Sequence, residues 1–193
     1  MAEPLHEASE SGENPGRYQE LLSNGALLVA RDLLTDPNFN QSIVLLCQYG
    51  NDGAYGLVLN RPSHMPLGEI FEHPPEGFGG PESRRRVYIG GPVQPTELQI
   101  LQVDADPVPQ SLQVAENVHL GGAWTELEEI LARDPANLHL FLGYSGWGEG
   151  QLEAEIEAGA WEVLRTDVRK LLAAPEVEWM AGGESLKRFL ASF

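Results

Sequence analysis

The chain of 193 residues has the size of one domain, and its 42% hydrophobic and 21% charged residues are typical of a globular protein. Its 29 acidic residues against 12 basic ones give a net charge of −17, which repels nucleic-acid phosphates and anionic lipid and so disfavours direct binding to either. The single cysteine, Cys47, excludes an intramolecular disulfide and a Cys-based metal site.

The first residues of the chain differ in character from the rest. Residues 1–16 are acidic and polar, so we expect a disordered acidic tail there and a single domain over 17–193. The tail lacks the basic and apolar regions of a signal peptide, and no apolar run in the chain is long enough to span a membrane. These absences predict a cytoplasmic protein with no membrane partner.

Apolar runs and turn residues predict strands in the first third of the domain. A strand is expected over 26–30, and a hairpin is formed by 42–48 and 54–59, with Tyr-Gly-Asn-Asp-Gly as its turn. Cys47 lies within the hairpin, where a small core residue is the expected role and a reactive thiol the alternative. A short helix should follow at 66–71, opening on Pro66.

Proline and glycine interrupt the middle of the chain. Residues 73–86 contain three of each, which predicts a long loop that ends in the arginine cluster at 84–86. Short strands are then expected at 87–89, 97–103, 112–114 and 118–120.

The last third of the chain has mostly helical patterns. A helix is expected to begin at Thr125, with Glu128 completing a capping box. An apolar strand over 138–142 should then enter a tight glycine turn. The following elements are predicted to be a helix at 151–158 capped by Gly159, a strand at 161–164, a helix capped by Thr166, and an apolar segment at 176–193 interrupted by Gly182-Gly183. Strands first and helices last favour an α+β fold.

Three glycine-rich motifs carry a family resemblance. They are Gly53-Ala-Tyr-Gly-Leu-Val-Leu-Asn-Arg-Pro62, Tyr88-Ile-Gly-Gly-Pro-Val93 and Gly143-Tyr-Ser-Gly-Trp-Gly-Glu-Gly-Gln-Leu-Glu-Ala-Glu-Ile156. Together with Ala26-Leu-Leu-Val-Ala30 upstream, they resemble the YqgE/AlgH family of bacterial proteins in matching order, from about residue 20 to the C-terminus.

The resemblance implies a fold but no mechanism. It implies an α+β domain with a bifurcated, mostly antiparallel sheet that forms a pseudo-barrel with helices packed around it. It also implies a cytosolic protein of undefined biochemical role, one of whose family names comes from a proposed regulatory link to alginate synthesis. The family supplies no catalytic residue. Where it usually has a Leu-His pair this chain has Leu101-Gln102, which weakens any catalytic or ligand role for that histidine. Where alanine is common it has Ser145, which is therefore a poor candidate for a nucleophile.

The motifs do not complete any familiar catalytic or cofactor pattern. The run Gly-Tyr-Ser-Gly-Trp at 143–147 lacks the second glycine of a hydrolase nucleophile elbow, because Trp147 stands there. The spacing of the glycines at 143, 146, 148 and 150 fits neither a dinucleotide fingerprint nor a phosphate loop. We expect these glycines to serve close packing, with anion binding as the alternative.

Acidic residues and histidines give no metal pattern. Glu153 and Glu157 should share a solvated face of their helix. No two histidines have helical metal spacing, and His119 and His139 are expected to form at most a cross-strand pair. No metal and no cofactor are predicted.

We expect the three motif turns to converge at one end of the sheet and form one shallow surface or cleft. Arg61 would supply its charge, Tyr144 and Trp147 its aromatic walls, and Glu155 an ion pair with Arg61. Such a surface suits a small molecule or peptide, whereas the alternative is that these residues only lock the turns. The expected lining residues are Asn60, Arg61, Gly90, Gly91, Pro92, Tyr144, Trp147, Gln151 and Glu155.

Three functions remain open from the sequence. The absence of a complete catalytic set favours a non-catalytic regulatory or interaction protein, including an indirect regulator of transcription. The alternative is a small-metabolite-binding protein or enzyme that uses the cleft around Arg61, Tyr144 and Trp147. A direct DNA-binding regulator is disfavoured by the charge of −17 and by the lack of a helix-turn-helix. The partner, protein or small molecule, and the oligomeric state are not given by the sequence.

Overall fold

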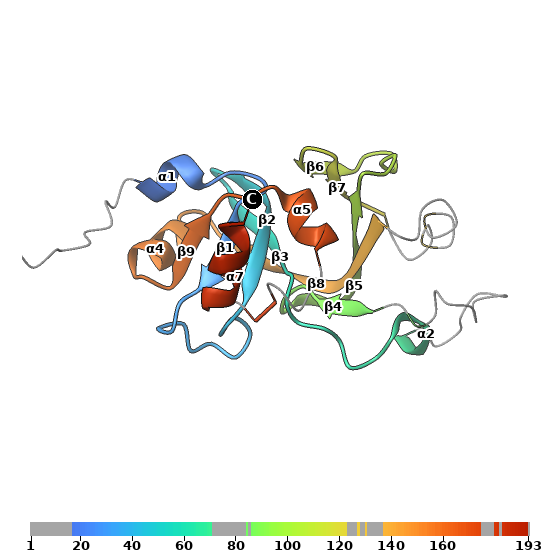
Figure 1. Cartoon of the computed structure of the whole chain (residues 1–193), viewed down its shortest axis with the longest axis horizontal. Coiled ribbons are helices and arrows are strands. Elements are labelled where there is room, and N and C mark those ends of the chain that lie inside the picture. The colour runs from blue at the N-terminus through green and yellow to red at the C-terminus, as the bar shows by residue number, and fades with distance from the viewer. Residues whose placement is uncertain are drawn as a thin grey trace, which may run out of the picture.

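The computed structural model of the chain contains, within its described residues, nine strands and a few short helices (Figure 1). The expected acidic tail, most of the 73–86 loop and the capping box at Thr125 lie outside the described part. The structure describes residues 17–70, 84, 86–122, 127, 130, 137–174, 180–181 and 183–192.

The strands form one continuous sheet in the order β6-β7-β5-β8-β3-β2-β1-β9, with β4 added beside β8. Neighbouring strands are antiparallel, except for the parallel pair β4 and β8. The strands are β1 (Leu27–Ala30), β2 (Ile43–Gly50), β3 (Gly53–Val58), β4 (Val87–Ile89), β5 (Val93–Val103), β6 (Leu112–Ala115), β7 (Val118–Leu120), β8 (Leu138–Trp147) and β9 (Trp161–Leu164). The described helices are α1 (Arg17–Leu21), α2 (Leu67–Ile70), α4 (Gln151–Glu157), α5 (Val168–Ala173) and α7 (Gly183–Leu190).

Strand β8 joins the two halves of the sheet. Its residues 138–142 pair with β4 and β5, whereas its residues 145–147 pair with β3. Gly143 stands between the two stretches with a left-handed φ of 66°, which bends the strand from one half to the other. The sheet is therefore bifurcated at β8, as the family resemblance implies.

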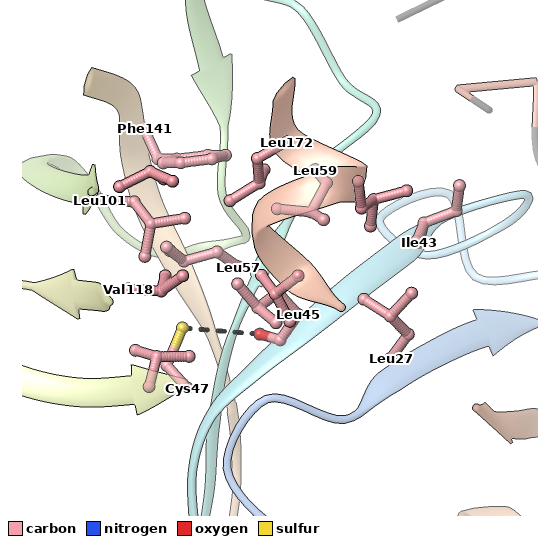
Figure 2. Close-up of a cluster of buried hydrophobic side chains, with 14 of the residues drawn as sticks. Leu27, Ile43, Leu45, Cys47, Leu57, Leu59, Leu101, Val118, Phe141 and Leu172 are labelled. Atoms are coloured by element: carbon pink, nitrogen blue, oxygen red, sulfur yellow. Dashed lines mark hydrogen bonds between the residues drawn. The ribbon is translucent and has the colours of Figure 1, made fainter. Parts of the chain in front are cut away.

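The sheet curls around a central core without closing into a barrel. The β6 end of the sheet lies close to Gly25, two residues before β1, because a Cβ on Gly25 would lie 3.1 Å from the Val114 carbonyl oxygen. The concave face is filled by side chains from both halves together with Leu171 and Leu172 of α5 and Leu186 of α7. Figure 2 shows part of this core, with leucine, valine and phenylalanine side chains from β1, β2, β3, β5, β7 and β8 around Leu172.

Two further apolar clusters cover the outer faces of the sheet. One joins β1, β2 and β3 to α4 through side chains such as Leu28, Val44 and Leu152. The other joins β5 and β8 to α2 through Ile100, Leu140 and Leu67. Every layer of the domain thus buries apolar surface, which is the main source of its stability.

Most of the expected elements are present, and the β2–β3 hairpin turns at residues 51–52 as its turn chemistry predicts. Gly159 ends α4 in the left-handed conformation expected of a helix cap. The cap of α5, however, is Asp167 and not Thr166. Its carboxylate accepts hydrogen bonds from the Arg169 and Lys170 amides, and a carboxylate also suits the helix N-terminus electrostatically.

Two other expectations are wrong. The apolar strand does not end at Leu142 but continues to Trp147, so the glycine turn is confined to the three residues before α4. His119 and His139 do not pair across the sheet, because the register sets His119 opposite Gln102 and His139 opposite Leu101, on opposite faces. Among the described residues, every helix is too short and polar to span a bilayer.

Candidate functional site

The three glycine-rich motifs meet where β3, β4 and β8 lie side by side. The Gly90 amide donates to the Leu142 carbonyl at 2.8 Å, and the Gly90 carbonyl accepts from the Val58 amide at 2.9 Å. The Ile89 amide donates to the Arg61 carbonyl at 2.8 Å, so the Asn-Arg-Pro end of the first motif is attached as well. Segments far apart in the sequence therefore form one hydrogen-bonded junction.

Glycine is required at this junction because two backbones nearly touch. A Cβ on Gly91 would lie 2.3 Å from the Tyr144 carbonyl carbon, and one on Gly143 would lie 2.6 Å from the Gly91 carbonyl oxygen. Neither distance leaves room for a side chain. Gly143, like Gly91, thus serves close packing, which is the first of the two roles weighed for the glycines of its motif, whereas a Cβ on Gly150 would meet nothing within 4 Å.

Ser145 fastens the same junction. Its hydroxyl donates to the Gly90 carbonyl oxygen at 3.1 Å, and the residue is completely buried. A hydroxyl that is buried and already committed to a carbonyl is unsuited to nucleophilic attack.

Glu155 on α4 holds two tryptophans by their indole nitrogens. Its Oε2 accepts from Trp147 Nε1 at 2.9 Å and from Trp161 Nε1 at 2.8 Å, and its Oε1 accepts from Gln151 Nε2 at 2.9 Å. Both indoles are buried, at 5% and 2% exposure, so their N–H groups need an acceptor inside the protein. The expected ion pair between Glu155 and Arg61 is wrong, because the carboxylate is engaged here.

Arg61 is held by the loop that leads into β2. Its Nη2 donates to the carbonyl oxygen and to the Oδ1 of Asn40, both at 3.0 Å. Partial burial lowers the pKa of Arg61, and the nearby charge of Asp36 opposes that shift. The neighbour of Asn40, Phe39, packs on Trp147 with the ring centroids 6.0 Å apart. The segment 39–40 therefore lies between the guanidinium and the indole.

The two expected aromatic walls belong to different faces of the sheet. Tyr144 stacks on Tyr55 with a centroid distance of 4.5 Å and packs against the central core. Trp147 points to the other side and joins the outer cluster with α4. Arg61, Tyr144 and Trp147 therefore do not line one common cleft. The convergence of the motifs holds for their backbones but not for these three side chains.

The remaining expected site residues divide between internal and surface positions. Asn60 accepts from the Ile43 amide and donates to the carbonyls of Gln41 and Met180, so it ties three segments together. Pro92 and Gln151 are exposed.

The other two glutamates of α4 also accept hydrogen bonds from aromatic residues. Tyr49 donates its hydroxyl to Glu153 at 2.5 Å, and Tyr18 donates to Glu157 at 2.8 Å. The bond to Glu153, together with burial, raises the pKa of Tyr49 to about 12. The Glu153–Glu157 face is thus tethered by two tyrosines, whereas the sequence pattern predicted a solvated face.

A cavity of about 720 Å³ lies away from the motif junction, beside the β5–β6 connection and the end of β7. Its volume is typical of a small-molecule site. Val108, Ile130 and Leu138 are each at most 7% exposed and give it an apolar floor. The other lining residues that the structure describes are Gln102, Asp104, Ala105, Asp106 and Asn117.

Gln102 projects from β5 into this cavity although it is only 2% exposed. The one hydrogen bond found for its amide within the described part of the chain is a long one, 3.5 Å from Nε2 to the Gly121 carbonyl. His119 stands opposite it on β7, and its Nδ1 is buried with no partner among the described residues. Two neighbouring polar side chains are therefore incompletely satisfied, which is unusual for buried groups.

One polar residue in the sequence could have indicated this cavity. Gln102 stands among Ile100, Leu101 and Val103 at the apolar end of β5. Most of the other described lining residues come from connections between strands, whose meeting point no local pattern reveals.

These features define a class of α+β protein. Its curled sheet divides at β8, and three glycine-rich motifs meet at one junction. The family model described as AlgH-like matches residues 27–187, which is most of the chain. The chain belongs to this family.

Relatives agree with that assignment. A UPF0301 protein of Xanthomonas campestris is 37% identical over 158 residues, which cover 79% of this chain and 83% of that protein. The solution structure of the AlgH protein from Pseudomonas aeruginosa matches with a TM-score of 0.69 and 30% identity, covering 88% of this chain and 87% of the other. A crystal structure of a Corynebacterium diphtheriae protein, at 21% identity, TM-score 0.65 and coverage of 88% and 92%, shares the fold.

Proposed function

We propose that this protein acts by binding and not by catalysis, as a cytoplasmic regulatory or interaction protein, including an indirect regulator of transcription. The observation that carries the proposal is the internal use of the motif side chains. Glu155, Ser145 and Asn60 all make hydrogen bonds to the protein itself. A catalytic set needs a nucleophile and a base that face a space for substrate. These side chains support the fold instead.

The surface that we assign to a partner lies beside the motif junction. Pro92 is exposed, and Tyr144, which stands opposite Val93 in the β5–β8 register, is partly exposed. Accessible aromatic side chains on a rigid sheet are typical of binding surfaces. The backbone contacts of Gly91 and Gly143 hold this surface rigid.

A photo-crosslinking residue at Pro92 tests the interaction function. In the native host, a discrete covalent adduct is expected from this position and not from Glu116, an exposed control position in the β6–β7 turn. Identical adduct patterns at the two positions, or none at Pro92, would count against the proposed surface. A substrate turnover that disappears in folded Ser145→Ala protein would overturn the non-catalytic proposal.

A second candidate function is small-molecule binding, and the cavity beside Gln102 favours it. Its volume and its incompletely satisfied polar groups support this role, whereas no cleft is formed by Arg61, Tyr144 and Trp147. A metabolite screen by NMR should perturb resonances of Gln102 and Ala105, and the Gln102→Leu variant should not respond. A screen in which no compound perturbs these resonances would reject this function.

A further inference from the structure

We infer that the cavity beside Gln102 binds a small organic cation, a molecule with an ammonium or guanidinium group on a short apolar body. This inference rests on the second proposed function, small-molecule binding, and adds the chemistry of the ligand. It concerns residues outside the three family motifs.

The rim of the cavity carries negative charge. Asp104 and Asp106 both line it, and the lining residues within the described part of the chain include no Lys or Arg. Asp104 forms an ion pair with Arg169, in which Oδ1 and Nη1 are 3.2 Å apart. No hydrogen bond or ion pair to the Asp106 side chain is found within the described part of the chain, so this carboxylate is available to an incoming cation.

The polar groups deeper in the cavity can accept hydrogen bonds. The buried Gln102 amide, which lines the cavity, uses its nitrogen toward Gly121, and its Oε1 accepts no hydrogen bond from the described residues. The Asn117 side chain lines the same space. An ammonium group supplies three N–H donors and a guanidinium supplies five, and both lack acceptors of their own. Such a group would satisfy Gln102 and Asp106 together.

The apolar floor of the cavity favours a ligand with a hydrocarbon body next to its cationic group. Val108, Ile130 and Leu138 present apolar side chains next to these acceptors. Burying a short hydrocarbon chain against them is favourable by roughly 0.8 kcal/mol per CH₂ group. A fully hydrophilic cation would leave this surface in contact with water, so an amine with an alkyl body fits better than a bare metal ion.

Net charge alone could mimic this selectivity, because a protein of charge −17 attracts every cation. The experiment therefore compares probes of one shape and variants of one charge. Hexylammonium, hexanol and hexanoate have the same chain length and differ in charge. Asp106→Asn and Asp52→Asn each remove one exposed carboxylate, but Asp52 lies in the β2–β3 turn and does not line the cavity.

The measurement is an NMR titration of the full-length protein. Hexylammonium should shift the resonances of Gln102, Ala105 and Asn117 in a saturable way, and hexanol and hexanoate should shift them less. Asp106→Asn is expected to weaken hexylammonium binding about tenfold, which corresponds to about 1.4 kcal/mol, while Asp52→Asn should leave it unchanged. Equal weakening by both variants would overturn the inference, because it would show that hexylammonium responds only to the overall negative charge of the protein.

Two outcomes separate the inference from the function on which it rests. If hexanol or hexanoate binds in the cavity as well as hexylammonium does, small-molecule binding stands and the cation inference is wrong. If no probe shifts the cavity resonances, both are wrong.

Gln102→Leu distinguishes a binding role from a structural one. Because Gln102 is poorly satisfied, replacing it with leucine should leave thermal stability unchanged or raised while abolishing hexylammonium binding. A clear loss of thermal stability with binding retained would assign Gln102 to the fold and overturn its role in the site.

Discussion

Single carboxylates in this protein are satisfied by aromatic donors as well as by cations. Glu155 receives two indole N–H groups and one amide, and its helix neighbours Glu153 and Glu157 receive tyrosine hydroxyls. In a chain with 29 acidic and 12 basic residues, most carboxylates cannot find a cationic partner. Neutral donors that are themselves partly buried provide an alternative.

The double indole bond makes Glu155 the most sensitive of the three glutamates on α4. Glu155→Gln should lower the free energy of unfolding by about 1–3 kcal/mol, because the amide cannot accept from both buried N–H groups as well as a carboxylate does. The matched change Glu157→Gln, which affects one exposed bond to Tyr18, should cost no more than about 0.5 kcal/mol. Urea unfolding followed by tryptophan fluorescence measures both, and equal losses would contradict this account.

The bond between Tyr49 and Glu153 predicts a loss of stability at alkaline pH. The pKa of Tyr49 is raised from 10.0 to about 12 in the folded protein. Its contribution is therefore fully present below pH 10 and is lost as the pH rises toward 12. The unfolding free energy should fall less steeply over this range in Tyr49→Phe than in the natural chain, and phenolate absorbance reports the titration. Parallel pH profiles would show that the bond has no such effect.

At the scale of the element, glycine has two different uses in and near β8. Gly143 and Gly150 have nearly the same left-handed φ, 66° and 68°. A Cβ at Gly143 would collide with the Gly91 and Val93 carbonyl oxygens, whereas a Cβ at Gly150 would meet nothing within 4 Å. The first glycine permits a close approach of backbones, and the second only permits a turn before a helix.

This contrast can be measured directly. Gly150→Ala should cost roughly 1–2 kcal/mol of stability, the ordinary penalty for an alanine in this conformation. Gly143→Ala should cost about 1–3 kcal/mol more, because the methyl group must also displace two carbonyls. Chemical denaturation of the two variants under identical conditions gives the difference, and a difference near zero would refute the role of close approach.

Local patterns predicted the elements that depend on neighbouring residues. The β2–β3 hairpin follows from its Asn-Asp-Gly turn, and α4 follows from Leu152 and Ile156 four residues apart with Gly159 behind them. The extent of β8 could not be predicted in this way, because a glycine in the left-handed conformation within a strand has the same sequence signature as a turn.

The candidate site was predicted only at the level of the backbone. Opposite charges favoured an Arg61–Glu155 ion pair, but Asn40 supplies the partner of Arg61, and two indoles supply the partners of Glu155. The alternation of side chains along β8 places Tyr144 and Trp147 on opposite faces once the strand is known to continue through both. The cavity beside Gln102 is formed by several connections that local patterns do not bring together. Only Gln102 itself, a polar residue between Leu101 and Val103, could be noticed in the sequence.

At the scale of the whole molecule, the core is continuous across both halves of the sheet. Cys47 lies in it with no exposed surface, and burial raises the pKa of its thiol (Figure 2). The structure thus favours the packing role for this cysteine over the reactive one. Its thiol donates a hydrogen bond to the Leu45 carbonyl oxygen, 3.6 Å from Sγ.

Cys47 therefore serves as a reporter of global unfolding. Iodoacetamide should not label it in the native protein, and labelling should begin only in urea concentrations that unfold the domain. An added cysteine at the exposed position Asn51 (Asn51→Cys) provides the control that reacts without denaturant. Native labelling of Cys47 at the rate of the control would mean that the core opens locally.

The division of β8 between two sets of partners has a mechanical consequence. Leu140 pairs with β5 in one wing of the sheet and Trp147 with β3 in the other, yet both belong to one uninterrupted strand. Detaching either wing removes partners from the strand that braces the other, so the wings should not behave as separate folding units. Their amide protons should exchange with deuterium in a single concerted event, and the AlgH-like domain should melt as one body.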